Sequence, residues 1–295
     1  MTSSGSASSS PYTSSGEPAG RDVAARALRD VSDLLHLPAI AFVVAAAFLF
    51  VRVVDDGRTN ETGVGLYLAA VLATQLSIAL HNSWCDRAVD AVAKPWRLVP
   101  RGAIDPAFVL FAALGLLLLG LTLAWSQGPG VLLFVAAGTA AGFVYNAWLK
   151  GTSWSWLPFA LALPTLAVCS LLVAGRLDGI PFDLYLIGVP LVLAIHLADA
   201  VGDIEGDRLA GSHGLAVRLG ERRSFLACWA GLLLAAIVAA SLRPFSAGPG
   251  PAFALSLILL CIAVTSLAWM PRAHRSLIFA SAVALAVDHV GAVSV

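Results

Sequence analysis

The stretch GVGLYLAAVLATQLSIALHNSWCDRAVDAVAKPWR, from Gly63 to Arg97, decides the fold class of this sequence. Its first eighteen residues are apolar enough to cross a membrane as a helix. The run then ends in a polar segment that carries Asn82, Asp86 and Asp90. Carboxylates at membrane depth are costly, and they usually serve a function. The stretch therefore predicts a transmembrane helix with a polar site at one end.

The composition of the whole chain is that of a membrane protein. Of its 295 residues, 59% are hydrophobic and 12% are charged, whereas soluble domains average about 45–50% apolar residues. Runs of about 20 mostly apolar residues recur along the chain and predict nine transmembrane helices. The predicted spans are residues 34–54, 63–85, 107–125, 130–148, 154–174, 184–201, 225–242, 252–269 and 277–293. We expect an all-α, multi-pass membrane protein.

The basic residues indicate how this protein is oriented. Fourteen of the eighteen Lys and Arg residues fall in the N-terminal segment and in the loops that nine spans place on the same side. Because cytoplasmic loops carry an excess of Lys and Arg, we predict a cytoplasmic N-terminus and a cytoplasmic polar site in the cell membrane. The preference for Arg over Lys, with abundant Ala, Leu and Gly, suggests a bacterial source.

The N-terminal residues 1–21 differ from the rest of the chain. They are rich in Ser, Gly and Pro and contain no apolar run, so we predict a disordered tail. Residues 22–295 are predicted to form one transmembrane domain. The four cysteines lie in or beside apolar runs without metal-ligand spacing, and we expect them to be buried small side chains.

An acidic pattern occurs twice in the sequence, each time at the cytoplasmic end of a predicted span. Positions i, i+4 and i+8 of a helix fall within an arc of roughly 80° and rise about 12 Å. Like charges at this spacing destabilise a helix, so each stripe requires a cation. Oxygen ligands without His or Cys suit Mg²⁺, which also binds substrate phosphates. The predicted metal ligands are Asn82, Asp86 and Asp90 in the first motif and Asp199, Asp203 and Asp207 in the second.

Basic residues close to both motifs fit the same anion. Lys94 and Lys150 are the only lysines among eighteen basic residues, and both lie beside motif-like sequence. A lysine ammonium binds phosphate as a compact point charge. Two acidic stripes that face each other would hold two Mg²⁺ ions and a diphosphate between them. The alternative is that the acids are interfacial residues paired with neighbouring arginines. The predicted diphosphate-binding residues are Arg87, Lys94, Arg97, Lys150 and Arg208.

Four segments in order, NSWCDRAVD, KPWRLVPRG, YNAWLK and DAVGDIEGD, resemble the motifs of the UbiA superfamily of intramembrane prenyltransferases. The resemblance runs from about residue 25 to near the end of the chain. It implies nine transmembrane helices around a central cavity, and a Mg²⁺-bound isoprenoid diphosphate as donor. By resemblance, the catalytic residues are Asp86, Asp203, Tyr145 and Lys150.

The resemblance also implies a reaction. Mg²⁺ and cationic side chains stabilise the leaving diphosphate, so the allylic C–O bond breaks. A lipid-embedded cavity keeps the resulting cation from water until a lipophilic acceptor, aromatic or of another kind, captures it. No nucleic-acid partner is expected. Ser83 departs from the family pattern, which commonly has Asp there; we expect the metal site to survive this loss of one charge.

Two alternatives remain open at this point. A terpene cyclase of the same superfamily would ionise the same donor and close the cation on itself without an acceptor. A transporter would place its charges near the membrane midplane on broken helices, whereas these acids cluster at one face. Among the other polar residues, His81 and His196 are expected to be structural, and Glu205 is expected to pair with a loop arginine.

Overall fold

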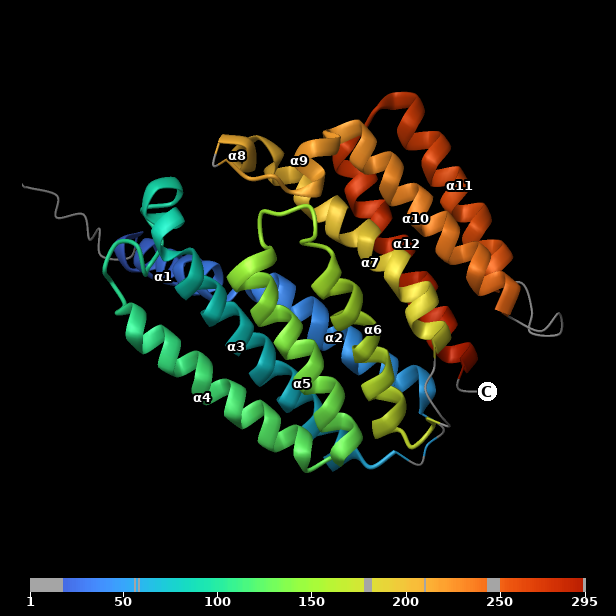
Figure 1. Cartoon of the computed structure of the whole chain (residues 1–295), viewed down its shortest axis with the longest axis horizontal. Helices are drawn as coiled ribbons and strands as arrows, with labels where there is room; N and C mark the ends of the chain where they lie inside the picture. The colour runs from blue at the N-terminus through green and yellow to red at the C-terminus, as the bar shows by residue number, and fades with distance from the viewer. Residues whose placement is uncertain are drawn as a thin grey trace, which may run out of the picture.

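The computed structural model describes residues 18–55, 57, 59–177, 182–209, 211–242 and 250–293, and every regular element in these ranges is helical. A helix lies at each of the nine predicted spans (Figure 1). These helices are α2 (Leu37–Val54), α3 (Glu61–Ala93), α4 (Pro106–Trp125), α5 (Pro129–Val144), α6 (Leu157–Val173), α7 (Phe182–Ala200), α10 (Glu221–Leu242), α11 (Gly250–Ala268) and α12 (Pro271–Val293). The prediction of an all-α protein is confirmed for the described residues.

Five shorter or flanking elements complete the chain. They are α1 (Pro18–Leu35), the π-helix η1 (Tyr145–Leu149), the 3₁₀-helix η2 (Val201–Asp203), α8 (Ile204–Leu209) and α9 (Leu215–Leu219). Of the tail that we predicted to be disordered, residues 1–17 lie outside the described residues, and α1 begins at Pro18.

Six helical segments among the described residues are long and apolar enough to cross a membrane. They are α2, α3, α4, α5 with η1, α7 with the two elements that follow it, and α10. Helix α6 is apolar but has 17 residues, and α11 is described with its side chains only in part. The protein is therefore built from membrane-spanning helices, while nine crossings stay a prediction.

Helix α3 is longer than a membrane crossing requires. The helix has 33 residues, which corresponds to about 50 Å, whereas the hydrocarbon core of a bilayer is about 30 Å thick. Its N-terminus is fixed by the Asn60 side chain, which accepts a hydrogen bond from the Thr62 amide. About four turns at the other end are left to present polar side chains outside the apolar layer.

Close helix contacts hold the bundle around this site. A Cβ added to Gly120 of α4 would lie 2.5 Å from the Thr74 methyl group of α3, and one added to Gly231 of α10 would lie 2.8 Å from the Pro190 carbonyl oxygen of α7.

Figure 1 shows α1, the segment after α3, the segment after η1, α8 and α9 at one end of the bundle, opposite the α4–α5 turn. Both acidic motifs lie at this end.

Candidate functional site

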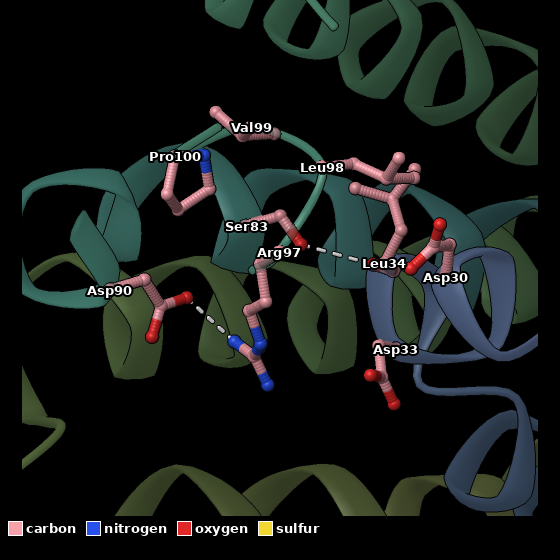
Figure 2. Close-up of a pocket in the computed structure, with 9 residues that line it drawn as sticks. All are labelled: Asp30, Asp33, Leu34, Ser83, Asp90, Arg97, Leu98, Val99 and Pro100. Atoms are coloured by element: carbon pink, nitrogen blue, oxygen red, sulfur yellow. Dashed lines mark hydrogen bonds and ion pairs between the residues drawn. The ribbon is translucent and has the colours of Figure 1, made fainter. Parts of the chain in front are cut away.

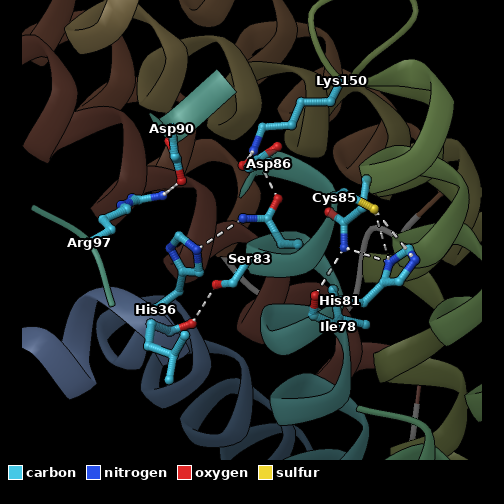
Figure 3. A network of polar contacts seen from close by, with 12 residues as sticks. His36, Ile78, His81, Ser83, Cys85, Asp86, Asp90, Arg97 and Lys150 are labelled. Carbon is cyan, nitrogen blue, oxygen red and sulfur yellow. Dashed lines mark hydrogen bonds and ion pairs between the residues drawn. The ribbon is translucent and has the colours of Figure 1, made fainter. Parts of the chain in front are cut away.

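The first acidic motif lies along α3 as predicted, and two of its members share one cation. The Lys150 Nζ donates to Asn82 Oδ1 at 2.8 Å and forms an ion pair with Asp86. The third member, Asp90, is buried and accepts from Arg97 at 2.6 Å. Figure 3 shows Lys150 and Arg97 reaching these carboxylates from two different segments of the chain. The motif is a row of oxygens with two cations held against it.

A π-helical turn places Lys150. Helix α5 ends at Val144 and continues as η1, and the Lys150 amide donates to the Tyr145 carbonyl at 2.8 Å. The turn is fixed to α3 because Asn146 Nδ2 donates to the Ile78 carbonyl at 2.9 Å. Single π-helical turns inside α-helices often occur at functional sites. Here the turn brings the only lysine of the segment onto the first motif.

The second motif is not one continuous helical stripe, and this part of the prediction is wrong. Asp199 lies in the last turn of α7, Asp203 ends the 3₁₀-helix η2, and Asp207 lies in α8. Gly202 sits at the break, where the absence of a side chain lowers helix propensity and the chain tightens into a 3₁₀ turn. Asp199 accepts from Arg275 of α12 at 2.6 Å.

Aromatic rings connect the segments that carry the two motifs. Tyr145 begins η1, the turn that ends beside Lys150, and its ring packs edge-on against Phe159 with centroids 4.8 Å apart. Phe159 in turn lies 5.0 Å from the ring of His196, which precedes Asp199 by about one turn of α7. A row of aromatic rings therefore runs from the turn that carries Lys150 to the helix that carries Asp199.

The other predicted diphosphate-binding residues have different partners in this structure. Arg87 stacks over the Trp84 ring at 4.4 Å and donates to the carbonyl of the same residue. Arg208 pairs with Glu205 at 3.2 Å, which confirms the prediction for that glutamate. Lys94 is exposed and caps the C-terminus of α3. Their roles toward a diphosphate stay predictions.

Two residues of the site were missed in the sequence. Arg275 pairs with the second motif from α12, and His36 contacts the first motif with its Nε2 3.1 Å from Asn82 Nδ2. His36 precedes the membrane-spanning α2, and burial, followed by the charge of Arg97, holds its pKa below the usual range of histidine. Neither residue belongs to a local motif, because each reaches its partner from a distant part of the chain.

The two remaining histidines near the site have protein partners, as expected for structural residues. The His81 ring stacks on Phe143 with centroids 4.1 Å apart, and its Nδ1 lies 3.3 Å from Asn146 Nδ2. His196 Nε2 lies 2.9 Å from the Ser155 hydroxyl.

Two hollows adjoin this site. A narrow polar pocket lies between α1 and the segment after α3; in Figure 2, Asp30 and Asp33 lie on one side of it and Arg97 on the other. A larger apolar groove lies between α2, α6, α7 and α12. It reaches Ile195 of α7, one helical turn from Asp199. The acids are therefore close to a space that suits a hydrocarbon chain.

The donor atoms fit a hard divalent cation. Within the described residues no three His, Cys, Asp or Glu side chains gather closely enough to hold a metal ion alone. Mg²⁺ does not require such a cage, since it keeps waters and is bound through one or two carboxylates together with substrate phosphates. The Lys150 ammonium, held between Asn82 and Asp86, marks a point where two oxygens of the first motif already bind a cation.

Comparison with known proteins gives one consistent result. Residues 35–285 match the profile described as the UbiA prenyltransferase family. The chain is 31% identical over 210 residues to the bacteriochlorophyll synthase 33 kDa chain of Rhodobacter capsulatus, covering 67% of this chain and 68% of that protein. It is 30% identical over 215 residues to the digeranylgeranylglyceryl phosphate synthase of Methanoregula boonei, covering 70% of this chain and 74% of that protein.

A solved structure gives the same fold. The UbiA homolog from Archaeoglobus fulgidus bound to DMAPP and Mg²⁺ superimposes with a TM-score of 0.71 at 17% identity, covering 90% of this chain and 99% of that one.

Proposed function

Because the chain belongs to the UbiA prenyltransferase family, we propose that it transfers a prenyl group from a Mg²⁺-bound allylic diphosphate to a lipophilic acceptor. The observation that carries this proposal is the row of oxygens on α3, where the Lys150 ammonium is held between Asn82 and Asp86. The relatives are named as synthases of bacteriochlorophyll and of digeranylgeranylglyceryl phosphate. Of the activities that these names describe, we propose only the transfer of a prenyl group for this chain.

The ion pairs of the site suggest how its residues act on the donor. Three acids each have a basic partner: Asp86 has Lys150, Asp90 has Arg97 and Asp199 has Arg275. When bound, Mg²⁺ would supply positive charge that stabilises the leaving diphosphate. If these acids held Mg²⁺, their basic partners Lys150, Arg97 and Arg275 would be available to bind the diphosphate oxygens. Charge-assisted hydrogen bonds of this kind position the leaving group and stabilise its developing charge.

The proposal assigns the metal-binding role to both motifs, with two Mg²⁺ ions. The predicted ligands are Asn82, Asp86 and Asp90 with Asp199, Asp203 and Asp207. Tyr145 begins the η1 turn that carries Lys150 to the first motif, and we propose that its ring face stabilises an allylic cation by cation–π attraction. The apolar groove would take the prenyl chain and exclude water from the reacting carbon.

We also propose the topology that the sequence predicts. Nine crossings and a cytoplasmic N-terminus put both motifs, and therefore the diphosphate, on the cytoplasmic side of a bacterial cell membrane. The gathering of α1, α8 and α9 at the motif end of the bundle supports this arrangement (Figure 1).

Diphosphate release tests the function directly. Purified protein in nanodiscs is incubated with Mg²⁺ and allylic diphosphates of increasing chain length, and both diphosphate and the organic product are measured. We expect release that depends on Mg²⁺. Asp86→Asn and Asp203→Asn keep the size of the side chain but remove its charge, so they should lower turnover at least about 100-fold. Glu221→Gln removes an exposed carboxylate outside the motifs and serves as the matched control.

The same assay separates the competing functions. A hydrocarbon or alcohol formed without any acceptor would favour the terpene cyclase. Full turnover in Asp86→Asn or Asp203→Asn would contradict the metal assignment, and no diphosphate release from any donor by folded protein would contradict both enzymes.

A further inference from the structure

The joint between α1 and α2 is held against the first motif by a strained residue. His36 separates the two helices and has φ 51° and ψ 44°, in the left-handed region that side chains other than glycine seldom adopt. Its carbonyl accepts from the Ala39 and Ile40 amides at 3.0 and 3.2 Å. Such a conformation persists only where the surroundings enforce it, and it is common at functional sites.

Ser83 fixes the backbone of this joint. Its buried hydroxyl donates to the Leu34 carbonyl at 3.0 Å, one of the carbonyls that the end of α1 leaves without a helical partner. Leu34 and Leu35 also pack on an apolar cluster that contains Leu80 and Val99. The joint is therefore docked on α3 by a hydrogen bond and by apolar contacts, and Figure 2 shows the Ser83 side chain directed at Leu34.

The two partners of the Asn82 side chain, Lys150 and His36, show which way its amide points. A lysine ammonium only donates hydrogen bonds, so the Asn82 atom 2.8 Å from Lys150 Nζ is the amide oxygen. The amide nitrogen consequently faces His36 Nε2 at 3.1 Å. That nitrogen must accept the hydrogen bond, which puts the imidazole proton on Nδ1. If the amide turned over, its NH₂ group would face both Lys150 and any bound cation.

We propose that His36 is a positioning residue, which holds the Asn82 amide with its oxygen toward the cation of the metal–diphosphate site. The inference rests on the proposed function, because it assumes that this oxygen binds Mg²⁺. It adds the α1–α2 joint to the site. It also explains Ser83, because this serine docks the backbone from which His36 reaches Asn82 (Figure 3).

Two substitutions at position 36 separate positioning from stability. Asparagine adopts the left-handed conformation more readily than other residues, but its side chain is too short to reach Asn82. Glutamine has no such backbone advantage, yet its side-chain oxygen can accept the same hydrogen bond. His36→Asn should therefore keep or raise the thermal unfolding midpoint and lose the contact, whereas His36→Gln should keep the contact.

Binding of Mn²⁺ to the full-length protein in nanodiscs, followed by electron paramagnetic resonance of the free ion, gives a readout apart from turnover. Replacing a residue that orients a metal ligand typically weakens metal affinity about 10–100-fold. We expect Mn²⁺ affinity to fall at least about 10-fold in His36→Asn and to stay within about threefold of the wild type in His36→Gln. Ser83→Ala removes the hydrogen bond that docks the joint. Its loss of Mn²⁺ affinity should lie between those of His36→Gln and His36→Asn.

The possible results distinguish the role of His36 from the function on which it depends. Wild-type affinity for Mn²⁺ in His36→Asn would overturn the positioning role while leaving the metal site intact. Equal losses in His36→Asn and His36→Gln would overturn it as well, since only the first removes the acceptor. A wild-type protein that binds no Mn²⁺ would overturn the proposed metal site, and the role of His36 with it.

Discussion

Ser83 shows how a single residue can depart from a family pattern for a structural reason. The hydroxyl is buried and donates to the Leu34 carbonyl. An ionised carboxylate only accepts hydrogen bonds, so aspartate at this position would set two acceptors against each other. The family pattern alone suggests only that the metal site has lost one charge. The structure adds that the serine hydroxyl is a hydrogen-bond donor to the α1–α2 joint, a role that an ionised aspartate does not fill.

Restoring the family residue at position 83 should be harmful. Ser83→Asp should lower the free energy of unfolding by about 2–3 kcal/mol, because it places a buried carboxylate, which only accepts hydrogen bonds, against the Leu34 carbonyl that Ser83 now donates to. Ser83→Thr retains the hydroxyl and should therefore be destabilised less than Ser83→Asp. Thermal unfolding in detergent, followed by tryptophan fluorescence, compares the two. A Ser83→Asp protein as stable as Ser83→Thr would contradict the proposed docking of the joint.

At the scale of elements, residue spacing correctly predicted which side chains share a face of one continuous helix. It failed where a helix is interrupted and where a partner comes from a distant part of the chain. Asn82, Asp86 and Asp90 share a face of α3 because the helix is continuous. The same spacing misled for the second motif, where the chain tightens into η2 beside Gly202. The partners His36 and Arg275 could not be predicted at all. Each depends on the packing of helices far apart in sequence, which spacing within a segment does not encode.

The contact between α7 and α10 provides an element-scale prediction. A Cβ at position 231 of α10 would lie only 2.8 Å from the Pro190 carbonyl oxygen of α7, so Gly231→Ala must push the two helices apart. We expect a loss of about 1–3 kcal/mol in the free energy of unfolding. Gly115→Ala in α4 is the matched control, because its Cβ would meet open space and alanine favours the helix. Equal unfolding midpoints for the two variants would contradict this view of the contact.

At the scale of the whole molecule, the side of the membrane that faces the donor depends on how many helices cross it. Helix α6 is the critical case, because its 17 residues span about 26 Å, slightly less than the hydrocarbon core of about 30 Å. The α4–α5 turn and α9 are separated by α5, α6 and α7. If all three helices cross, the two segments lie on opposite sides; if α6 does not, they lie on the same side.

Cysteine labelling decides between these topologies. In a background in which the four native cysteines are replaced and diphosphate release is retained, single substitutions are made at two exposed positions, Ser126→Cys after α4 and Arg218→Cys in α9. A membrane-impermeant maleimide added to intact cells should label only Ser126→Cys, and permeabilised cells should show both. The reverse pattern would place the acidic motifs outside the cell. Labelling of both positions in intact cells would remove α6 from the crossings and would contradict both the nine predicted spans and the orientation inferred from the basic residues.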